Sequence, residues 1–301
     1  METEAADRLG AFGAARWPAP AKINRFLHIT GRRPDGRHNL QTLFQFLGWG
    51  DELSFRVRRD GVLQRQGDTA TIPEDDDLVL RAARALRAAT GAPHGVDIAV
   101  HKRIPMGSGL GGGSSDAATT LIALNTLWNC RLDTATLARI GLDLGADVPI
   151  FIQGRASWAE GVGEELTPVA PDEPWLLLAM PDCTVSTTEA FAHPTLERAA
   201  KPVTMDDFAA GRCRNVFEPV ARTLAPQVGE TLDALAQAAE RVESNTRPQL
   251  SGSGSACFLC LPDRATARAA QAFVPVTLPT LVTRAQNSSP LHVASLGPIG
   301  R

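Results

Sequence analysis

The sequence Pro-Met-Gly-Ser-Gly-Leu-Gly-Gly-Gly-Ser-Ser at residues 105–115 constrains this chain more than any other segment. A backbone with so many glycines can approach a ligand closely and turn several N–H groups towards it. An alternating pattern typical of a strand precedes it at 96–100, and a helical pattern follows at 116–128. A strand, a glycine loop and a helix N-terminus bind phosphate, because unpaired amides and the helix dipole attract an anion. We therefore expect a phosphate-binding loop; a flexible linker is the alternative.

Two common phosphate-binding loops do not fit this segment. A Walker A loop needs a lysine directly after its glycines, and none follows here. The dinucleotide pattern Gly-x-Gly-x-x-Gly can be placed on Gly107, Gly109 and Gly112, but any run this rich in glycine produces that match. A dinucleotide loop also follows the first strand of its domain, whereas this one comes after about a third of the chain. The segment therefore indicates a phosphate loop of another kind.

Length and charge limit the classes of function. A chain of 301 residues can bury a sizeable core and is expected to form two lobes. The net charge of −3 gives no basic field, so we expect no nucleic-acid partner. No apolar run reaches the length of a membrane span, so we expect no membrane association. The first sixteen residues carry acidic side chains and no long apolar stretch, which predicts a frayed tail rather than a targeting segment.

The cysteines indicate a reducing compartment. There are five, an odd number, scattered along the chain, so we expect a cytoplasmic protein without disulfides. Cys257 and Cys260 form the one Cys-x-x-Cys pair, inside the apolar run 256–261. A zinc site would need two further ligands at suitable spacing, and none is evident. Buried cysteines of a strand are therefore the expectation.

Alternating strand and helix patterns predict a mixed α/β or α+β protein. Strands are expected at 22–29 and 41–56, with Asp35-Gly36 as a turn between them, and at 175–180 and 256–261. Helices are expected at 78–89, 134–144 and 229–242. The acidic run 75–77 lies directly before the first of these helices, so we interpret it as capping rather than metal binding.

The glycine loop resembles the phosphate-binding motif of the GHMP small-molecule kinases, which include galactokinase, homoserine kinase and mevalonate kinase. The family pattern Pro-x-x-x-Gly-Leu-Gly-x-Ser-Ser is matched, with one extra glycine, by Pro105, Gly109, Leu110, Gly111, Ser114 and Ser115. Further segments resemble the branch of the family that phosphorylates a diphosphocytidyl-linked polyol in the non-mevalonate isoprenoid pathway. These segments are 20–24, 30–38, 40–44, 145–151, 250–258 and 287–292.

The resemblance implies an α+β fold with two lobes. It implies an N-terminal ATP-binding lobe like ribosomal protein S5, at 17–160, and a ferredoxin-like C-terminal lobe, at 161–301, after the tail at 1–16. It also implies ATP and Mg²⁺ as cofactors, a small-molecule substrate, and phosphorylation of an alcohol. A monomer or weak homodimer is expected.

Within this resemblance, Asp147 is the candidate base and Lys22 its partner. Asp147 would accept the proton of the alcohol, and Lys22 would orient the hydroxyl and offset phosphate charge. We expect Pro149 to push Val148 into an extended conformation, which would hold Asp147 on a short connection. From the residues alone, Asp147 could equally cap a loop, and Lys22 could be a solubility lysine of an edge strand.

The loop residues implied to bind ATP are Pro105, Met106, Gly107, Ser108, Gly109, Leu110, Gly111, Gly112, Gly113, Ser114 and Ser115. The hydroxyls of Ser114 and Ser115 could reach a phosphate oxygen or Mg²⁺, or could cap the helix that follows. The metal ligands stay open among Ser114, Ser115 and Asp147.

Five residues are implied to bind the substrate. Asn24 and His38 match positions beside the diphosphocytidyl group, with His38 on the cytosine edge. Thr187 and Phe191 match the cytidine side, where Phe191 would stack on the base or, alternatively, belong to the core. The family has tyrosine before the histidine, whereas this chain has Arg37 and contains no tyrosine. A guanidinium also stacks on a ring, so Arg37 is the candidate replacement.

Two other functions fit the sequence less well. Another GHMP kinase, for homoserine or mevalonate, would lack the combination of Gly-x-His with Leu-Gln-Thr-Leu-Phe that stands at 36–44. A non-catalytic nucleotide-binding regulator would have lost the base or the lysine, and both Asp147 and Lys22 are present. Phosphorylation of the diphosphocytidyl compound is therefore the leading hypothesis.

Overall fold

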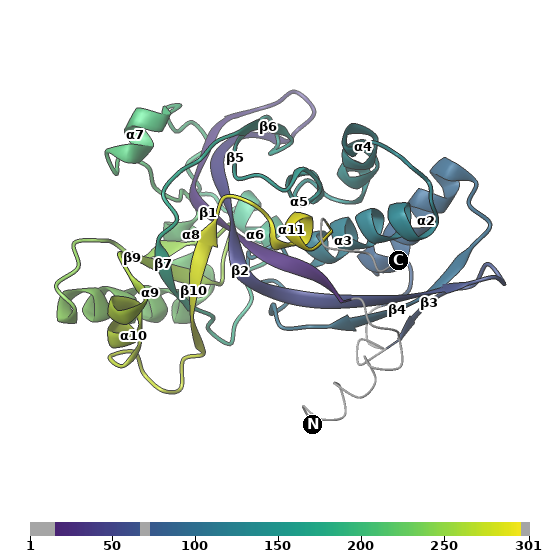
Figure 1. Ribbon diagram of the computed structural model, residues 1–301. Helices are drawn as coiled ribbons and strands as arrows, with labels where there is room; N and C mark the ends of the chain where they lie inside the picture. Colours follow the sequence, from purple (N-terminus) through teal and green to yellow (C-terminus); the bar gives the residue numbers. More distant parts are fainter. Residues whose placement is uncertain (1–15, 67–72, 296–301) are drawn as a thin grey trace.

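Two long antiparallel strands, β1 (Trp17–Arg32) and β2 (His38–Arg58), organise the fold. They belong to a computed structural model that describes residues 16–66 and 73–295 (Figure 1). A tight turn joins them: Gly36 has a φ of 85°, and its N–H donates to the carbonyl of Arg33 at 3.0 Å. The predicted strands and turn are confirmed, and both strands are longer than expected.

The strands form one mixed sheet. The order along its main path is β3-β4-β2-β10-β7-β9-β8, while β1 and β5 also pair with β2, and β6 pairs with β5. Only the pair β3–β4 is parallel among the paired strands of the described residues. The shorter strands are β3 (Leu63–Gln66), β4 (Gly95–His101), β5 (Ser157–Glu160), β6 (Glu165–Pro168), β7 (Trp175–Ala179), β8 (Gln249–Leu250), β9 (Cys257–Leu261) and β10 (Thr280–Gln286).

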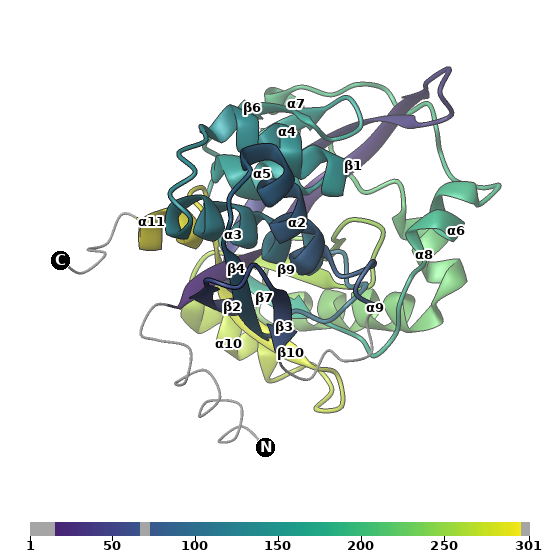
Figure 2. The ribbon, with the colours of Figure 1, turned by 90° about the vertical axis from the view of Figure 1, so that its right-hand side faces the viewer.

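The helices gather in two groups at the two ends of the sheet (Figures 1 and 2). One group contacts β1 and β2 through α3 (Gly112–Leu127) and α11 (Pro290–Ser295), and α2 (Leu78–Thr90), α4 (Thr134–Leu144) and α5 (Val148–Gln153) pack against α3. The other lies by β7, β9 and β10 and comprises α8 (Glu218–Leu224), α9 (Pro226–Arg241) and α10 (Arg264–Gln271). Two short helices, α6 (Thr187–Ala192) and α7 (Met205–Ala209), lie in the connections. The division at residue 160 stays a prediction.

The helix boundaries confirm the predicted capping and correct two expectations. Asp77 accepts hydrogen bonds from the N–H groups of Val79 and Leu80, at 2.8 and 3.3 Å, so it caps α2. Helix α3 begins at Gly112 rather than at residue 116, because the last glycines and both serines of the loop form its first turn.

Helix α5 provides the second correction. Val148 is not extended, because α5 begins at this residue. Pro149 occupies the second position of the helix, where a missing N–H costs no hydrogen bond. The proline therefore starts a helix directly after Asp147 instead of holding an extended connection.

A buried cluster joins the two halves of the chain and fixes the glycine loop. It contains Ile23 of β1, Phe258 of β9, and the two loop residues Ile104 and Leu110, all with at most 2% exposure. Burying such side chains contributes about 1.5–3 kcal/mol each. The glycine loop is therefore anchored in the core on both sides of its first glycines.

The two cysteines of the Cys-x-x-Cys pair are residues of a strand. Cys257 and Cys260 lie on β9 as free thiols, and burial raises the pKa of both, so the interpretation as strand cysteines is confirmed.

Across residues 16–66 and 73–295, none of the helices combines the length and hydropathy that crossing a bilayer would require.

Candidate active site

A cavity of about 680 Å³ lies between the glycine loop and the strands β1 and β2. Nearly all the predicted site residues line it: Lys22, Asn24, Arg37, His38, Pro105, Met106, Gly107, Ser108, Gly109, Gly111, Gly112, Gly113, Ser114, Asp147, Thr187 and Phe191. Leu110 and Ser115 do not, because both side chains are fully buried behind the wall. Ser114 is therefore the serine whose side chain lies at the cavity.

The loop has the backbone geometry of an anion cradle. Gly107, Gly109 and Gly111 have φ values of 69°, 76° and 74°, whereas the residues between them do not have positive φ. This alternation turns successive N–H groups towards one side of the chain. A Cβ at Gly109 would stand 2.2 Å from the carbonyl of Ser251, and one at Gly111 3.1 Å from the side chain of Lys22. Only glycine fits these two positions.

Irregularities in the pairing of β1 place two polar residues at the cavity. The register with β2 shifts between Pro20 and Lys22 and again after Asn24. Such bulges free N–H groups from the ladder and redirect side chains. The N–H of Lys22 donates to the carbonyl of Leu110 at 3.0 Å, and that of Asn24 to the hydroxyl of Ser251 at 3.3 Å. Strand β1 is thereby hydrogen-bonded to the glycine loop at 105–115 and to a second, C-terminal glycine loop at 251–254.

Lys22 and Asp147 form an ion pair in the wall of the cavity. The ammonium lies 3.1 Å from the carboxylate of Asp147 and donates to Oδ1 of Asn24 at 2.6 Å. It also lies 5.1 Å from the ring centre of Phe44, a favourable cation–π distance. The side chain of Lys22 is 4% exposed and that of Asp147 34%, so the carboxylate faces the opening.

The alternative roles of these two residues do not fit. Asp147 precedes α5 but makes no capping hydrogen bond to that helix, because its carboxylate turns to Lys22 instead. Lys22 is buried and paired, which is unlike a solubility lysine on an exposed edge.

Aromatic rings form one end of the cavity. The rings of His38 and Phe191 are stacked, with centres 5.1 Å apart, and Phe191 meets Phe217 edge to face at 4.9 Å. Burial lowers the pKa of His38, and the charges of Arg198 and Arg32 lower it further. The lowered pKa favours the neutral imidazole, which has one donor and one acceptor nitrogen. Its Nε2 is buried and has no hydrogen-bond partner within the described residues.

The remaining predicted substrate residues border this end. Arg37 is exposed on the turn between β1 and β2, where its N–H donates to the carboxylate of Asp35 at 3.0 Å. Thr187 begins α6, and its hydroxyl lies 3.0 Å from that of Ser253. This contact joins α6 to the C-terminal glycine loop.

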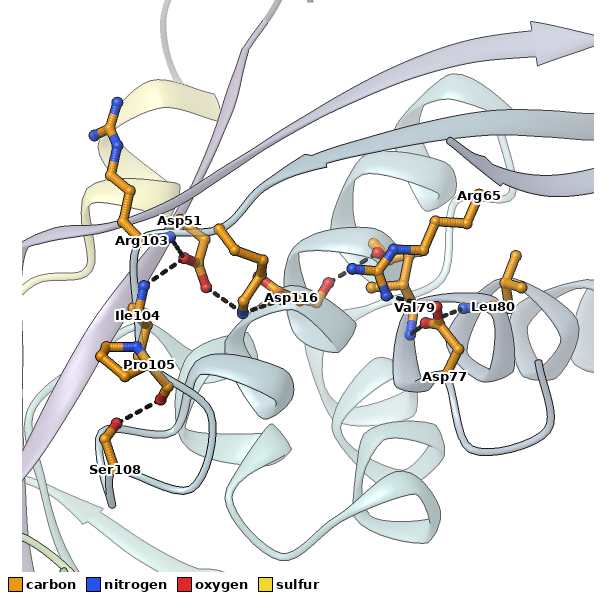
Figure 3. A network of polar contacts seen from close by, with 12 residues as sticks. Asp51, Arg65, Asp77, Val79, Leu80, Arg103, Ile104, Pro105, Ser108 and Asp116 are labelled. Atoms are coloured by element: carbon orange, nitrogen blue, oxygen red, sulfur yellow. Dashed lines mark hydrogen bonds and ion pairs between the residues drawn. The ribbon is translucent and has the colours of Figure 1, made fainter. Parts of the chain in front are cut away.

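A charged network that the sequence did not predict contributes a further part of the cavity wall, and its polar contacts are drawn in Figure 3. The ammonium of Lys102 lies 2.5 Å from Asp51 and 2.8 Å from Asp116. Burial raises the pKa of Asp116 to about 7 although the charge of Lys102 opposes this, and the charge of Asp51 adds to the rise. Arg65 and Asp77 continue the same wall. No sequence signal marks these contacts, because they join residues from separate elements.

Comparison with known proteins identifies the family. The family profile described as "GHMP kinases N terminal domain" matches residues 77–155. A curated 4-diphosphocytidyl-2-C-methyl-D-erythritol kinase of Halorhodospira halophila is 49% identical over 280 residues, which cover 92% of this chain and 95% of the relative. The chain belongs to the 4-diphosphocytidyl-2-C-methyl-D-erythritol kinase family.

Solved structures agree with this assignment. A crystal structure of a 4-(cytidine 5'-diphospho)-2C-methyl-D-erythritol kinase has a TM-score of 0.77 and 32% identity. The match covers 90% of this chain and 99% of the other. A mevalonate kinase, with a TM-score of 0.64 and 12% identity over 91% of this chain and 100% of its own, shares the fold alone. The predicted GHMP kinase fold and the resemblance to this branch of it are confirmed.

The raised pKa of Asp116 predicts a pH-dependent contribution to stability. A carboxyl that holds its proton more tightly in the folded state destabilises the fold as pH rises from about 4 to 7. Asp116→Asn should therefore gain stability relative to the unmodified protein over this range, by about 1 kcal/mol or more. Unfolding free energies at three pH values between 5 and 7.5 measure this gain. A difference in unfolding free energy between Asp116→Asn and the unmodified protein that is the same at all three pH values would contradict the prediction.

Proposed function

We propose that this protein transfers the γ-phosphoryl group of ATP to the 2-hydroxyl of 4-diphosphocytidyl-2-C-methyl-D-erythritol, a step of the non-mevalonate isoprenoid pathway. The observation that carries the proposal is the Lys22–Asp147 pair, which lines one cavity together with the glycine loop and the rings of His38 and Phe191. The names of the family members described above support this reaction.

The glycine loop is proposed to hold the phosphates of ATP. Its alternating backbone supplies N–H donors, and the sixteen-residue helix α3 directs the positive end of its dipole at the same place. The transition state of phosphoryl transfer is loose, so positioning and charge stabilisation provide most of the catalysis. Pre-organised amides supply both without needing a lysine within the loop.

Lys22 and Asp147 are proposed to act on the acceptor hydroxyl. The hydroxyl oxygen bonds to the γ-phosphorus while the bond from that phosphorus to ADP breaks, and the hydroxyl proton passes to the carboxylate of Asp147. Lys22 holds that carboxylate in place and offsets the negative charge of the phosphoryl group. Its hydrogen bond to Asn24 fixes the ammonium, so the pair is set before substrate binds.

Mg²⁺ is proposed to arrive with ATP rather than to occupy a site made by the protein alone. Within the part of the chain that the structure describes, no three acidic, histidine or cysteine side chains converge to hold a metal. Mg²⁺ is usually bound by one or two protein groups together with substrate phosphates. Asp147 and Ser114 fit this role, since both line the cavity beside the loop. Bound there, the ion would neutralise phosphate charge.

The aromatic end is proposed to bind the cytidine. A neutral His38 with an unpartnered Nε2 suits a hydrogen bond to the cytosine edge. Phe191 offers a ring face for stacking, and Arg37, exposed at the mouth of the cavity, offers a second planar group where relatives of this branch have tyrosine. Thr187 and Asn24 line the same cavity.

The protein is proposed to work in the reducing cytoplasm, because its cysteines are free thiols.

The reaction is tested by an ADP-release assay with three acceptors. The purified protein should release ADP with 4-diphosphocytidyl-2-C-methyl-D-erythritol and should be nearly inactive with homoserine or mevalonate, because neither carries a base for the His38–Phe191 end. Activity with homoserine or mevalonate alone would overturn the substrate assignment and leave the kinase assignment intact.

In the same assay, Lys22→Ala and Asp147→Ala should each lower kcat by at least about 100-fold, because each removes half of the pair that acts on the hydroxyl. Lys201→Ala and Asp143→Ala are matched controls on exposed residues outside the cavity and should keep normal turnover. Near-normal kcat in either of the first two variants, with the fold intact, would refute the assignment.

Arg37→Ala should raise the KM for the diphosphocytidyl substrate by about 5- to 10-fold, because loss of a stacking partner costs on the order of 1 kcal/mol. The KM for ATP should stay the same. Arg59→Ala removes an exposed arginine away from the cavity and serves as the control. An unchanged KM in Arg37→Ala would show that the arginine does not replace the tyrosine.

A further inference from the structure

Asp51 stands where strand β4 leaves the sheet to begin the glycine loop. The ladder between β2 and β4 reaches its last pair at Glu52 and His101, directly beside Asp51. Residues 102–104 therefore leave the sheet without strand partners for their N–H groups. The side chain of Asp51 is fully buried at this exit.

The carboxylate of Asp51 takes over the hydrogen bonds that the ladder no longer supplies. Its Oδ1 accepts from the N–H of Arg103 at 2.5 Å and from the N–H of Ile104 at 2.8 Å (Figure 3). Its Oδ2 accepts from the ammonium of Lys102 at 2.5 Å. Three consecutive residues before Pro105 are thus held by one side chain, which fixes the direction in which the loop departs.

Lys102 extends this hold to the far end of the loop. Its ammonium also donates at 2.8 Å to Asp116, which lies in the N-terminal part of α3, just after the loop. A Cβ placed on Gly112 would stand 3.3 Å from the same ammonium, so Lys102 lies directly against the start of that helix. Asp51 is therefore connected, through one lysine, to both ends of the phosphate cradle.

A role in stability alone does not account for this arrangement. Buried ion pairs contribute little net stability, because the cost of removing charges from water offsets their attraction. Here two carboxylates share one ammonium, and Oδ1 of Asp116 has no hydrogen-bond partner within the described residues, which adds to that cost. Lys102 and Asp116 also line the cavity, whereas a stabilising cluster could lie anywhere in the core.

We propose that Asp51 is a positioning residue of the nucleotide site, which holds both ends of the glycine loop so that its amides are pre-organised for the phosphates of ATP. The inference rests on the proposed function, because it takes the loop to bind a nucleotide. Asp51 does not line the cavity and acts through the backbone of 103–104 and through Lys102. Displacement of catalytic groups by about 1 Å can cost on the order of 100-fold in rate, so a loosened cradle has measurable consequences.

The test is the Asp51→Asn variant. Three quantities are measured: the Kd for a fluorescent ATP analogue, the KM for ATP and the KM for the diphosphocytidyl substrate. The amide keeps the size of the side chain but loses its charge and one acceptor oxygen. We expect the Kd for the analogue and the KM for ATP to rise at least about 10-fold. The KM for the diphosphocytidyl substrate should change less than about 2-fold, because the aromatic end is untouched.

Asp97→Asn is the matched control. Asp97 is a fully buried carboxylate on β4, held at 2.7 and 2.9 Å by Arg56 and Arg58, and it does not line the cavity. The Asp97→Asn variant should be less stable than the unmodified protein. It should still bind the ATP analogue with an unchanged Kd. An Asp51→Asn protein with a Kd like that of Asp97→Asn, or with equal rises in both KM values, would overturn the inference.

A second variant covers the case in which Asp51→Asn does not fold. Asp116→Asn keeps an oxygen for Lys102 and weakens only the link to α3, so the Kd for the analogue should rise by a smaller factor, about 3-fold. An unchanged Kd in that variant would then overturn the inference. Failure of the unmodified protein to bind the analogue would instead overturn the proposed function, so the two outcomes are distinguishable.

Discussion

The hydrogen bond from the N–H of Lys22 to the carbonyl of Leu110 is the contact on which the candidate active site depends. It exists because β1 leaves the ladder with β2 at a bulge, and it joins the strand that carries the ammonium to the loop that forms the cradle. Gly111, next to Leu110, has a φ of 74°, and a Cβ there would stand 2.9 Å from the ring of Phe151 and 3.1 Å from the side chain of Lys22, so this position requires glycine. The backbone contact therefore holds Lys22 directly against the glycine loop.

The cavity wall combines three chemically different groups of side chains. The stacked rings of His38 and Phe191 suit an uncharged base, while Lys102 and Asp116 form a charged wall beside the start of α3. The Lys22–Asp147 pair lines the same cavity. Under the proposed function, these differences in chemistry would give the two substrates separate places in one cavity.

Local patterns predicted much of this structure, and contacts between distant segments account for what they missed. The glycine loop, the cap of α2 at Asp77 and the turn at Gly36 follow from short-range chemistry. The pairing of Lys22 with Asp147 was expected only from the family resemblance, because 125 positions separate the two residues. The Asp51–Lys102–Asp116 network had no such pattern and depends on where β4 ends. The extended conformation predicted for Val148 was wrong, because Pro149 occupies the first turn of a helix that begins at Val148.

The most direct test of this account is a crystal structure with a non-hydrolysable ATP analogue and the diphosphocytidyl substrate bound together. The terminal phosphate of the analogue and the 2-hydroxyl of the substrate should both lie beside Lys22 and Asp147. The adenosine should extend towards Lys102, and the cytosine should contact His38 and Phe191. Cytosine bound on the Lys102 side, or a 2-hydroxyl out of reach of Asp147, would contradict the account.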